Sequence, residues 1–219
     1  TTNTAEQALY VMNHAEVKVL FVGDEKQYHK ALEVASQCPT LQMIVVCDNE
    51  VPLTEKQYSI HWNDFLALGN SPQYDTELDK RIVERNLDDL FTIIYTSGTT
   101  GEPKGVMLTY ENLAFQMVGH TERLSTVDNT DTSLAFLPLS HVFERAWTYF
   151  CLYKAITVYY LDDTNLVREA LAEVRPTLMC AVPRFYEKIF ATVHDRADAS
   201  SFVKRKLFRL AIATGKRVL

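Results

Sequence analysis

The chain has 219 residues, of which 47% are hydrophobic and 23% are charged, and this balance is typical of a globular protein with a sizeable core. The 22 Lys and Arg residues stand against 28 Asp and Glu residues, so the net charge is −6. A surface of that sign repels a phosphate backbone, which argues against general nucleic-acid binding.

The four cysteines are far apart in the sequence and form no Cys-x-x-Cys pair (Cys38, Cys47, Cys151 and Cys180). Each stands in or beside an apolar stretch, where a reduced cysteine behaves as a small hydrophobic residue. Neither disulfides nor a zinc site are therefore expected, and a reducing, cytoplasmic compartment fits. No apolar run approaches the roughly 20 residues that a membrane-spanning helix needs.

The first third of the chain alternates helices with short apolar strands. Thr4 can cap the first helix, with Gln7 at the capping-box position. The pattern predicts helices at residues 5–12 and 25–36, strands at 18–22 and 41–47, and a connector at 51–90 with a helix near 76–85. Strands separated by helices of this length indicate βαβ crossovers. We expect a partial first lobe at residues 1–80 and a second at 81–219.

The second part begins again with a strand at residues 90–95, followed by a Gly-rich loop. The pattern then predicts an extended segment at 106–108, strands at 132–137, 155–161 and 177–182, helices at 111–124, 142–153 and 165–174, and two closing helices from Pro183 onward. The fold class is therefore α/β, with mainly parallel sheets flanked by helices. Both ends of the sequence fall within helical patterns, so we expect a piece of a longer protein.

The Gly-rich loop reads Tyr95-Thr-Ser-Gly-Thr-Thr-Gly-Glu-Pro-Lys104-Gly. Pro103 before Lys104 distinguishes it from the nucleotide-kinase P-loop, and its glycine spacing distinguishes it from the dinucleotide-binding turn. Glycines allow close backbone approach, consecutive N–H groups can form an anion-binding concavity, and Lys104 adds a cation. A polar surface loop is the alternative that composition alone leaves open.

The full string from Tyr95 to Asn112 resembles the signature loop of the adenylate-forming superfamily, which includes acyl-CoA synthetases, luciferases and peptide-synthetase adenylation domains. The resemblance implies that the loop holds the β- and γ-phosphates of ATP. The implied phosphate-binding residues are Thr96, Ser97, Gly98, Thr99, Thr100, Gly101 and Lys104. Thr96 is also expected near Mg²⁺.

Two further strings are similar to long-chain fatty acyl-CoA synthetases: Leu137-Pro-Leu-Ser-His-Val-Phe-Glu-Arg145, and the segment from Arg175 to Ile189. They imply an acyl pocket that includes His141, Phe143, Glu144, Arg145 and Arg184. Helix capping or core packing is the alternative for His141, and pairing with Glu187 is the alternative for Arg184. Phe185, Ile189 and Phe190 are interpreted as core residues at helical spacing, and Asp162-Asp163 as acids at a helix N-terminus.

The resemblance implies an acid–thiol ligase whose substrates and cofactors are a long-chain fatty acid, ATP, Mg²⁺ and coenzyme A. No Tyr-Gly-x-Thr-Glu string, whose Glu would complete the Mg²⁺ site, occurs in this sequence. The implied C-terminal lobe and its lysine are absent as well. The chain therefore holds no complete catalytic set, and we expect it to be inactive alone. A ligase for an aryl or medium-chain acid and a non-catalytic nucleotide- or acyl-binding module remain as alternatives.

Basic residues gather near the end of the chain (Lys204, Arg205, Lys206, Arg209, Lys216 and Arg217). Their pattern favours the solvated face of a helix, and contact with an anionic membrane surface is the alternative. The resemblance adds an expectation of peripheral membrane contact, on the inner membrane face.

Overall fold

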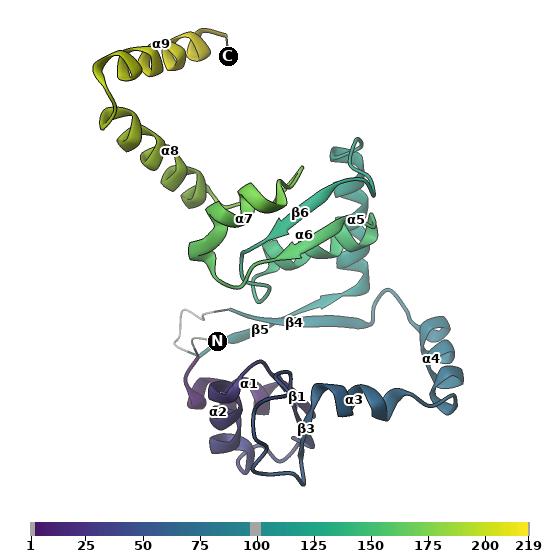
Figure 1. The fold of residues 1–219 in the computed structure, drawn as a ribbon. Coiled ribbons are helices and arrows are strands. Elements are labelled where there is room, and N and C mark those ends of the chain that lie inside the picture. The colour runs from purple at the N-terminus through teal and green to yellow at the C-terminus, as the bar shows by residue number, and fades with distance from the viewer. Residues whose placement is uncertain (1–2, 97–101, 219) are drawn as a thin grey trace. The chain divides into compact units, whose positions relative to one another are not determined.

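The computed structural model describes residues 3–96 and 102–218, with side chains up to residue 215. Its helices and strands form two compact units, residues 1–115 and 116–219 (Figure 1). The division falls within α5 (Tyr110–Arg123), later in the chain than the lobe boundary expected at residues 80 and 81. Within the first unit, a hydrogen bond between Tyr95 and His14 joins the strand before the Gly-rich loop to the first helix.

The first unit contains a parallel sheet in the order β1-β2-β3 with helices beside it. Its elements are α1 (Ala5–His14), β1 (Val19–Val22), α2 (Glu25–Ala35), β2 (Met43–Val46), β3 (Ser59–His61), α3 (Trp62–Gly69) and α4 (Gln73–Glu84). The capping box expected for α1 is confirmed, with Thr4 and Gln7 exchanging backbone-to-side-chain hydrogen bonds.

The sheet of the first unit is apolar on the side that packs against α2. Tyr28 of α2 is fully buried beside Ile44 and Val46, and its hydroxyl donates a hydrogen bond to Ser59 of β3 over 3.0 Å. Strand β3 and helix α3 lie in the segment for which a connector was expected. A strand of three residues carries too little periodicity to be recognised before its partner strand is known.

An antiparallel hairpin follows, formed by β4 (Leu90–Thr96) and β5 (Lys104–Thr109). It accounts for the extended segment expected at residues 106–108. The antiparallel pairing differs from the parallel pairing of the other sheets and places the two ends of the Gly-rich loop side by side.

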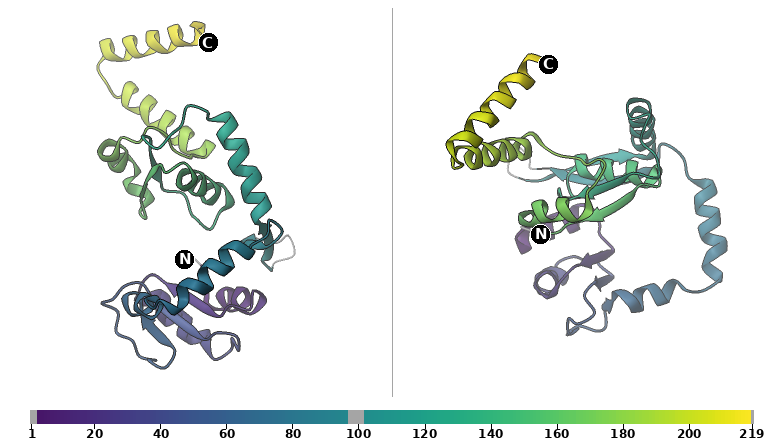
Figure 2. Two further views of the ribbon diagram at one scale, coloured as in Figure 1. Left: turned by 90° about the vertical axis from the view of Figure 1, so that its right-hand side faces the viewer. Right: turned by 45° about the horizontal axis from the view of Figure 1, so that its top comes forward.

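The second unit is built on a parallel pair of strands, β6 and β7. Its elements after α5 are β6 (Thr132–Ala135), α6 (Val142–Tyr153), β7 (Thr157–Tyr160), the short helix η1 (Thr164–Leu166), α7 (Val167–Val174), α8 (Pro183–Asp198) and α9 (Phe202–Val218). Helices α8 and α9 meet at an angle across residues 199–201 (Figure 2).

The strand expected at residues 177–182 is reduced to a single bridge between Leu178 and Ser133. The backbone N–H groups of Thr177 and Leu178 both donate to the carbonyl of Thr132, so the ladder does not advance along β6. The prediction of a full strand there was wrong, although the segment still packs Met179 and Ala181 against the core of the second unit.

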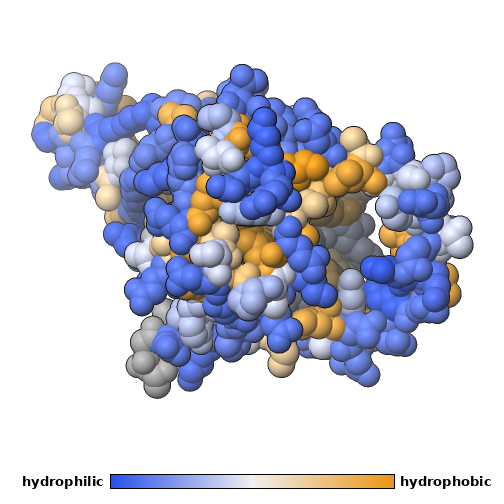
Figure 3. All heavy atoms as spheres, turned by 90° about the horizontal axis from the view of Figure 1, so that it is seen from below, coloured by the Kyte–Doolittle hydropathy of each residue, from blue (hydrophilic) through white to orange (hydrophobic). Residues whose placement is uncertain are grey.

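Both units leave large apolar side chains exposed, including Leu78 of α4 and Leu207 of α9. Figure 3 shows hydrophobic residues among hydrophilic ones on the face that it draws. Within the described residues, no helix is both long enough and apolar enough to cross a membrane.

Candidate functional site

The β4–β5 hairpin holds the two ends of the Gly-rich loop. Thr96, the last residue of β4, lies directly opposite Lys104, the first residue of β5, and both are exposed. Residues opposite each other in an antiparallel pair are about 4.5–5.5 Å apart and share one face of the sheet. The structure therefore brings together the first and last of the expected phosphate contacts. The others (Ser97, Gly98, Thr99, Thr100 and Gly101) lie outside the described residues.

Tyr95, next to Thr96, is anchored by a residue from the start of the chain. Its hydroxyl oxygen lies 2.7 Å from Nδ1 of His14, and the two rings meet edge to face. Burial raises the pKa of the Tyr95 phenol above its ordinary value. The sequence offers no local signal for the contact, because 81 positions separate the two residues.

Gly105 lies opposite Tyr95 in the hairpin and leaves room for its ring. A Cβ atom on Gly105 would lie 3.1 Å from Cζ of Tyr95 and 3.0 Å from Cγ2 of Ile93. Glycine inside a strand often marks such a close approach, so the signal was present in the sequence although the role was not assigned. His14 and Gly105 together fix the orientation of the strand end that enters the loop.

In the second unit, His141 is the N-cap residue of helix α6. The His141 ring nitrogen Nδ1 accepts a hydrogen bond from the Phe143 backbone N–H over 3.2 Å. The backbone N–H of His141 donates to the Pro138 carbonyl over 3.0 Å. Arg145 braces the same turn by donating from Nε to the Leu139 carbonyl over 2.8 Å. The helix-capping interpretation of His141 is thus confirmed, while its contact with an acyl substrate stays a prediction. The rings of His141 and Phe143 remain exposed.

Glu144 differs from the residues around it because it is 0% exposed. Within the described residues, neither of its carboxyl oxygens has a hydrogen-bond partner, and the same holds for the hydroxyl of the buried Thr148 one turn later. Burial raises the pKa of the Glu144 carboxyl to about 7. The structure therefore places this expected pocket residue in the interior, as an acid that keeps its proton up to neutral pH.

Two buried thiols, those of Cys151 and Cys180, lie near enough to the Glu144 carboxyl to interact with it electrostatically. Burial raises the pKa of Cys151 to about 11 and that of Cys180 to about 12, and the nearby Glu144 adds to both shifts. Thiols with such values stay protonated and unreactive at neutral pH. We assign them a packing role.

Arg184 is exposed in the first turn of α8, directly after Pro183. Within the described part of the chain it forms no ion pair with Glu187, so that alternative is not supported. Phe185 packs against Phe136 with ring centroids 5.0 Å apart, which confirms its role in the core. Ile189 and Phe190 are 43% and 63% exposed, so their assignment to the core was wrong.

The described residues provide few ligands for Mg²⁺. Asp163 caps the short helix η1 by accepting from the Asn165 N–H, which agrees with the interpretation of the Asp162-Asp163 pair as helix-terminal acids. No group of three or more His, Cys, Asp or Glu side chains suited to a metal ion occurs within residues 3–96 and 102–215. Thr96 is the one residue for which metal contact was expected, and a single hydroxyl does not make a metal site.

The sequence pattern of the AMP-binding enzyme family matches residues 1–215. The chain is 33% identical over 214 residues to long chain acyl-CoA synthetase 3 of Arabidopsis thaliana, covering 92% of this chain and 31% of that protein. It is 34% identical over 223 residues to the long-chain-fatty-acid–CoA ligase ACSBG2 of Xenopus laevis, covering 98% of this chain and 30% of that protein. The chain thus spans about a third of the length of these relatives.

Solved structures agree on the fold. A long-chain-fatty-acid CoA ligase from Rhodopseudomonas palustris, described as putative, superimposes with a TM-score of 0.65 at 16% identity, over 83% of this chain and 42% of that one. ATP-bound MatB from the same organism gives a TM-score of 0.62 at 23% identity, over 86% and 34% of the two chains. The match over nearly the whole sequence shows that this chain belongs to the AMP-binding enzyme family.

Proposed function

We propose that the chain is the phosphate-binding part, and a portion of the acyl-binding part, of an ATP-dependent long-chain fatty acid–CoA ligase. The observation that carries the proposal is the hairpin that sets Thr96 opposite Lys104 at the two ends of the Gly-rich loop. The relatives named as long-chain acyl-CoA synthetases and ligases support the choice of acid, because they match 92% and 98% of this chain.

The proposed reaction has two steps. A carboxylate oxygen of the fatty acid forms a bond to the α-phosphorus of ATP, and the bond to the bridging oxygen breaks, which releases pyrophosphate. The sulfur of coenzyme A, after losing its proton, then bonds to the acyl carbon, and AMP leaves. Catalysis of the first step requires mainly positioning and compensation of charge on the phosphates.

The residues of this chain contribute to the first step. Lys104 supplies a mobile cation for the terminal phosphates, and Thr96 supplies a hydroxyl donor from the opposite strand. Ser97, Gly98, Thr99, Thr100 and Gly101 complete the phosphate contacts in this proposal. Mg²⁺, when bound, would neutralise phosphate charge, but the described residues do not suffice to hold it and no step here depends on it.

The second unit contributes to acid binding in this proposal. The exposed His141 and Phe143 lie at the start of α6, and the Arg145 side chain holds the turn before them by donating to the Leu139 carbonyl. Arg184 lies in the first turn of α8. The buried Glu144 would support this turn from the interior rather than contact the acid. Four free thiols, two of them with raised pKa values, support a reducing compartment such as the cytoplasm.

The test is acid-dependent exchange of pyrophosphate into ATP, measured with the enzyme that contains this chain. We expect exchange with palmitate or oleate and little with benzoate or hexanoate. The variant Lys104→Ala should lose about tenfold or more in apparent ATP affinity, since it removes a charge-assisted contact. The matched control Lys80→Ala changes another exposed lysine, on α4, and should leave the affinity unchanged.

A preference for benzoate or short acids would replace the long-chain assignment with another acid. Binding of ATP without exchange for any acid would favour the non-catalytic nucleotide-binding module.

A further inference from the structure

The side chains of Tyr95 and Thr96 point to opposite faces of the β4–β5 hairpin, because they are neighbours in one strand. Thr96 and Lys104 share the face of the expected phosphate contacts. Tyr95 and Gly105 share the other face, where a Cβ atom on Gly105 would lie only 3.3 Å from the Tyr95 hydroxyl oxygen. The Tyr95 ring of β4 therefore packs on β5, on the face away from Thr96 and Lys104.

The hydroxyl of Tyr95 is held by helix α1. Nδ1 of His14 lies 2.7 Å from the hydroxyl oxygen. A hydroxyl both donates and accepts, so this bond persists whether or not Nδ1 carries a proton. The ring of Tyr10, one turn earlier in α1, stacks on the His14 ring with centroids 5.6 Å apart. His14 is thus oriented by its own helix and bonded to the hairpin.

Helix α1 is anchored at its C-terminal end. Met12 is buried in a hydrophobic cluster that α1 shares with α2. The side-chain amide of Asn13 donates to the carbonyl of Gln37, just after α2, over 3.1 Å. Within the described residues, no strand pairing joins the hairpin to the sheet β1-β2-β3. The bond between His14 and Tyr95 therefore links the hairpin that carries the loop to the packed core of the first unit.

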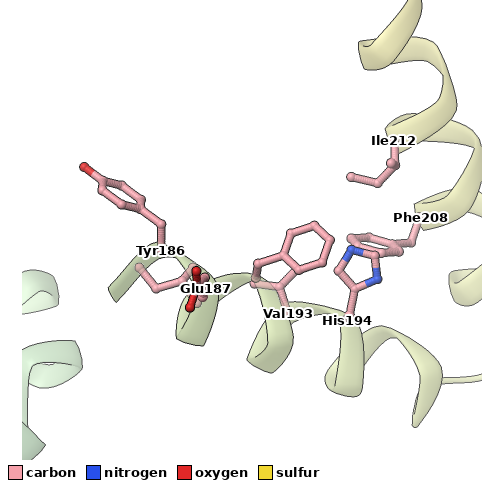
Figure 4. Close-up of a pocket in the computed structure, with 8 residues that line it drawn as sticks. Tyr186, Glu187, Val193, His194, Phe208 and Ile212 are labelled. Carbon is pink, nitrogen blue, oxygen red and sulfur yellow. The ribbon is translucent and has the colours of Figure 1, made fainter. Parts of the chain in front are cut away.

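His194 of α8 provides a comparison within the same chain. Its ring packs against Phe190 and against Phe208 of α9, with centroids 4.1 and 5.2 Å apart, in an apolar groove (Figure 4). Its Nε2 is buried and has no hydrogen-bond partner among the described residues. We therefore assign His194 a packing role, whereas His14 adds a directed hydrogen bond to its ring contacts.

We propose that His14 is a positioning residue for the phosphate loop. Through Tyr95 it holds the end of β4, so that Thr96 stays opposite Lys104 before ATP binds. Groups that are already in place lose little conformational freedom on binding, which strengthens the grip on the phosphates. The inference rests on the proposed ligase function, because it names a residue that supports the same ATP site.

The test is steady-state kinetics of the enzyme that contains this chain, with ATP and oleate varied in turn. His14→Phe and Tyr95→Phe each remove one partner of the bond and keep a ring, so each should raise KM for ATP about fivefold. The double variant should also show about a fivefold rise, because both single variants break the same bond. KM for oleate and kcat should stay unchanged, since the bond acts on the phosphate loop alone. His14→Asn keeps an amide near the position of Nδ1 and should recover most of the ATP affinity.

The matched controls are His194→Phe and Tyr10→Phe, which make the same replacements away from the bond and should leave KM for ATP unchanged. KM does not depend on the amount of folded enzyme, so a variant that only loses stability lowers the apparent kcat instead. That result, or a double variant with a rise of about 25-fold, would overturn the proposal, because the two residues would then act separately or only on folding.

The variant Lys104→Ala separates this inference from the proposed function. An unchanged KM for ATP in His14→Phe, beside a raised KM in Lys104→Ala, would overturn the role of His14 and leave the ligase function standing. An unchanged KM for ATP in both variants would overturn the phosphate-binding role of the loop as well.

Discussion

The carboxyl of Glu144 lies in the core of the second unit, and burial raises its pKa from 4.5 to about 7. The folded chain therefore holds this proton more tightly than the unfolded chain does. The stabilisation is fully present below pH 4.5, and it is lost as the pH rises to about 7. Glu144 is thus expected to make the folded state less stable at neutral pH than at mildly acidic pH.

We predict that Glu144→Gln removes this part of the pH dependence, because an amide does not titrate. The measurement is the free energy of unfolding in urea across the pH range, compared between the variant and the unchanged chain. The difference in the free energy of unfolding between the variant and the unchanged chain should change steadily from pH 4.5 to about 7 and stay constant above pH 7. Glu173→Gln, an exposed position on α7, is the control. An unchanged slope in Glu144→Gln would show that the carboxyl titrates in its ordinary range.

A second prediction at the residue scale compares two glycines. Gly105→Ala should destabilise the chain by about 1 kcal/mol, because the new methyl group crowds the Tyr95 ring and Ile93. A Cβ atom added at Gly119 of α5 would have no neighbouring atom within 4 Å. Gly119→Ala should therefore stabilise the chain by about 0.5–1 kcal/mol, because alanine has the higher helix propensity. Thermal unfolding of both variants measures the two effects. If Gly105→Ala does not destabilise the chain, the crowding of Tyr95 and Ile93 is not significant.

At the scale of elements, helix α6 depends on His141 for its N-terminal cap. His141→Ala removes the acceptor of the Phe143 N–H and should cost about 1 kcal/mol of stability. His141→Asn keeps a side-chain acceptor at that position and should retain most of the stability. Urea unfolding of the chain separates the two variants.

The same pair of variants distinguishes capping from acid binding in the enzyme that contains this chain. If the imidazole also contacts the acid, His141→Asn should raise KM for the fatty acid while stability is nearly unchanged. If His141→Asn leaves KM for the fatty acid unchanged, His141 acts as a cap alone.

The elements with strong local signals were predicted well. The capping box of α1 and the bounds of α6 could be recognised because the hydrophobic spacing and the cap residues lie within a few positions of each other. Strand β3 and the bridge at Leu178 could not be assigned correctly, since their pairing depends on Ile44 and Ser133, far away in the sequence. In the site, the loop and Lys104 were recognisable from their spacing, whereas the contact of Tyr95 with His14 was not.

At the scale of the whole molecule, the chain spans about a third of the length of its relatives. We predict that the purified 219 residues form no acyl-CoA from oleate, ATP and coenzyme A. The physical reason is that the phosphate loop compensates charge at one end of the nucleotide, while the expected acidic partner for Mg²⁺ is not in this sequence. Loss of free thiol from coenzyme A measures the reaction, and steady formation of oleoyl-CoA would contradict the prediction.

The sequence alone determined the class of the fold, the phosphate loop and the family resemblance, because these depend on hydrophobic periods and on residues that are neighbours in the chain. Only the tertiary structure decided which side chains meet. It set Thr96 against Lys104, put the His14 ring against Tyr95, and enclosed Glu144 without a partner among the described residues. It also turned Phe208 of α9 toward α8 and left Leu207 exposed. Burial and pairing arise between segments distant in sequence, which local patterns do not specify.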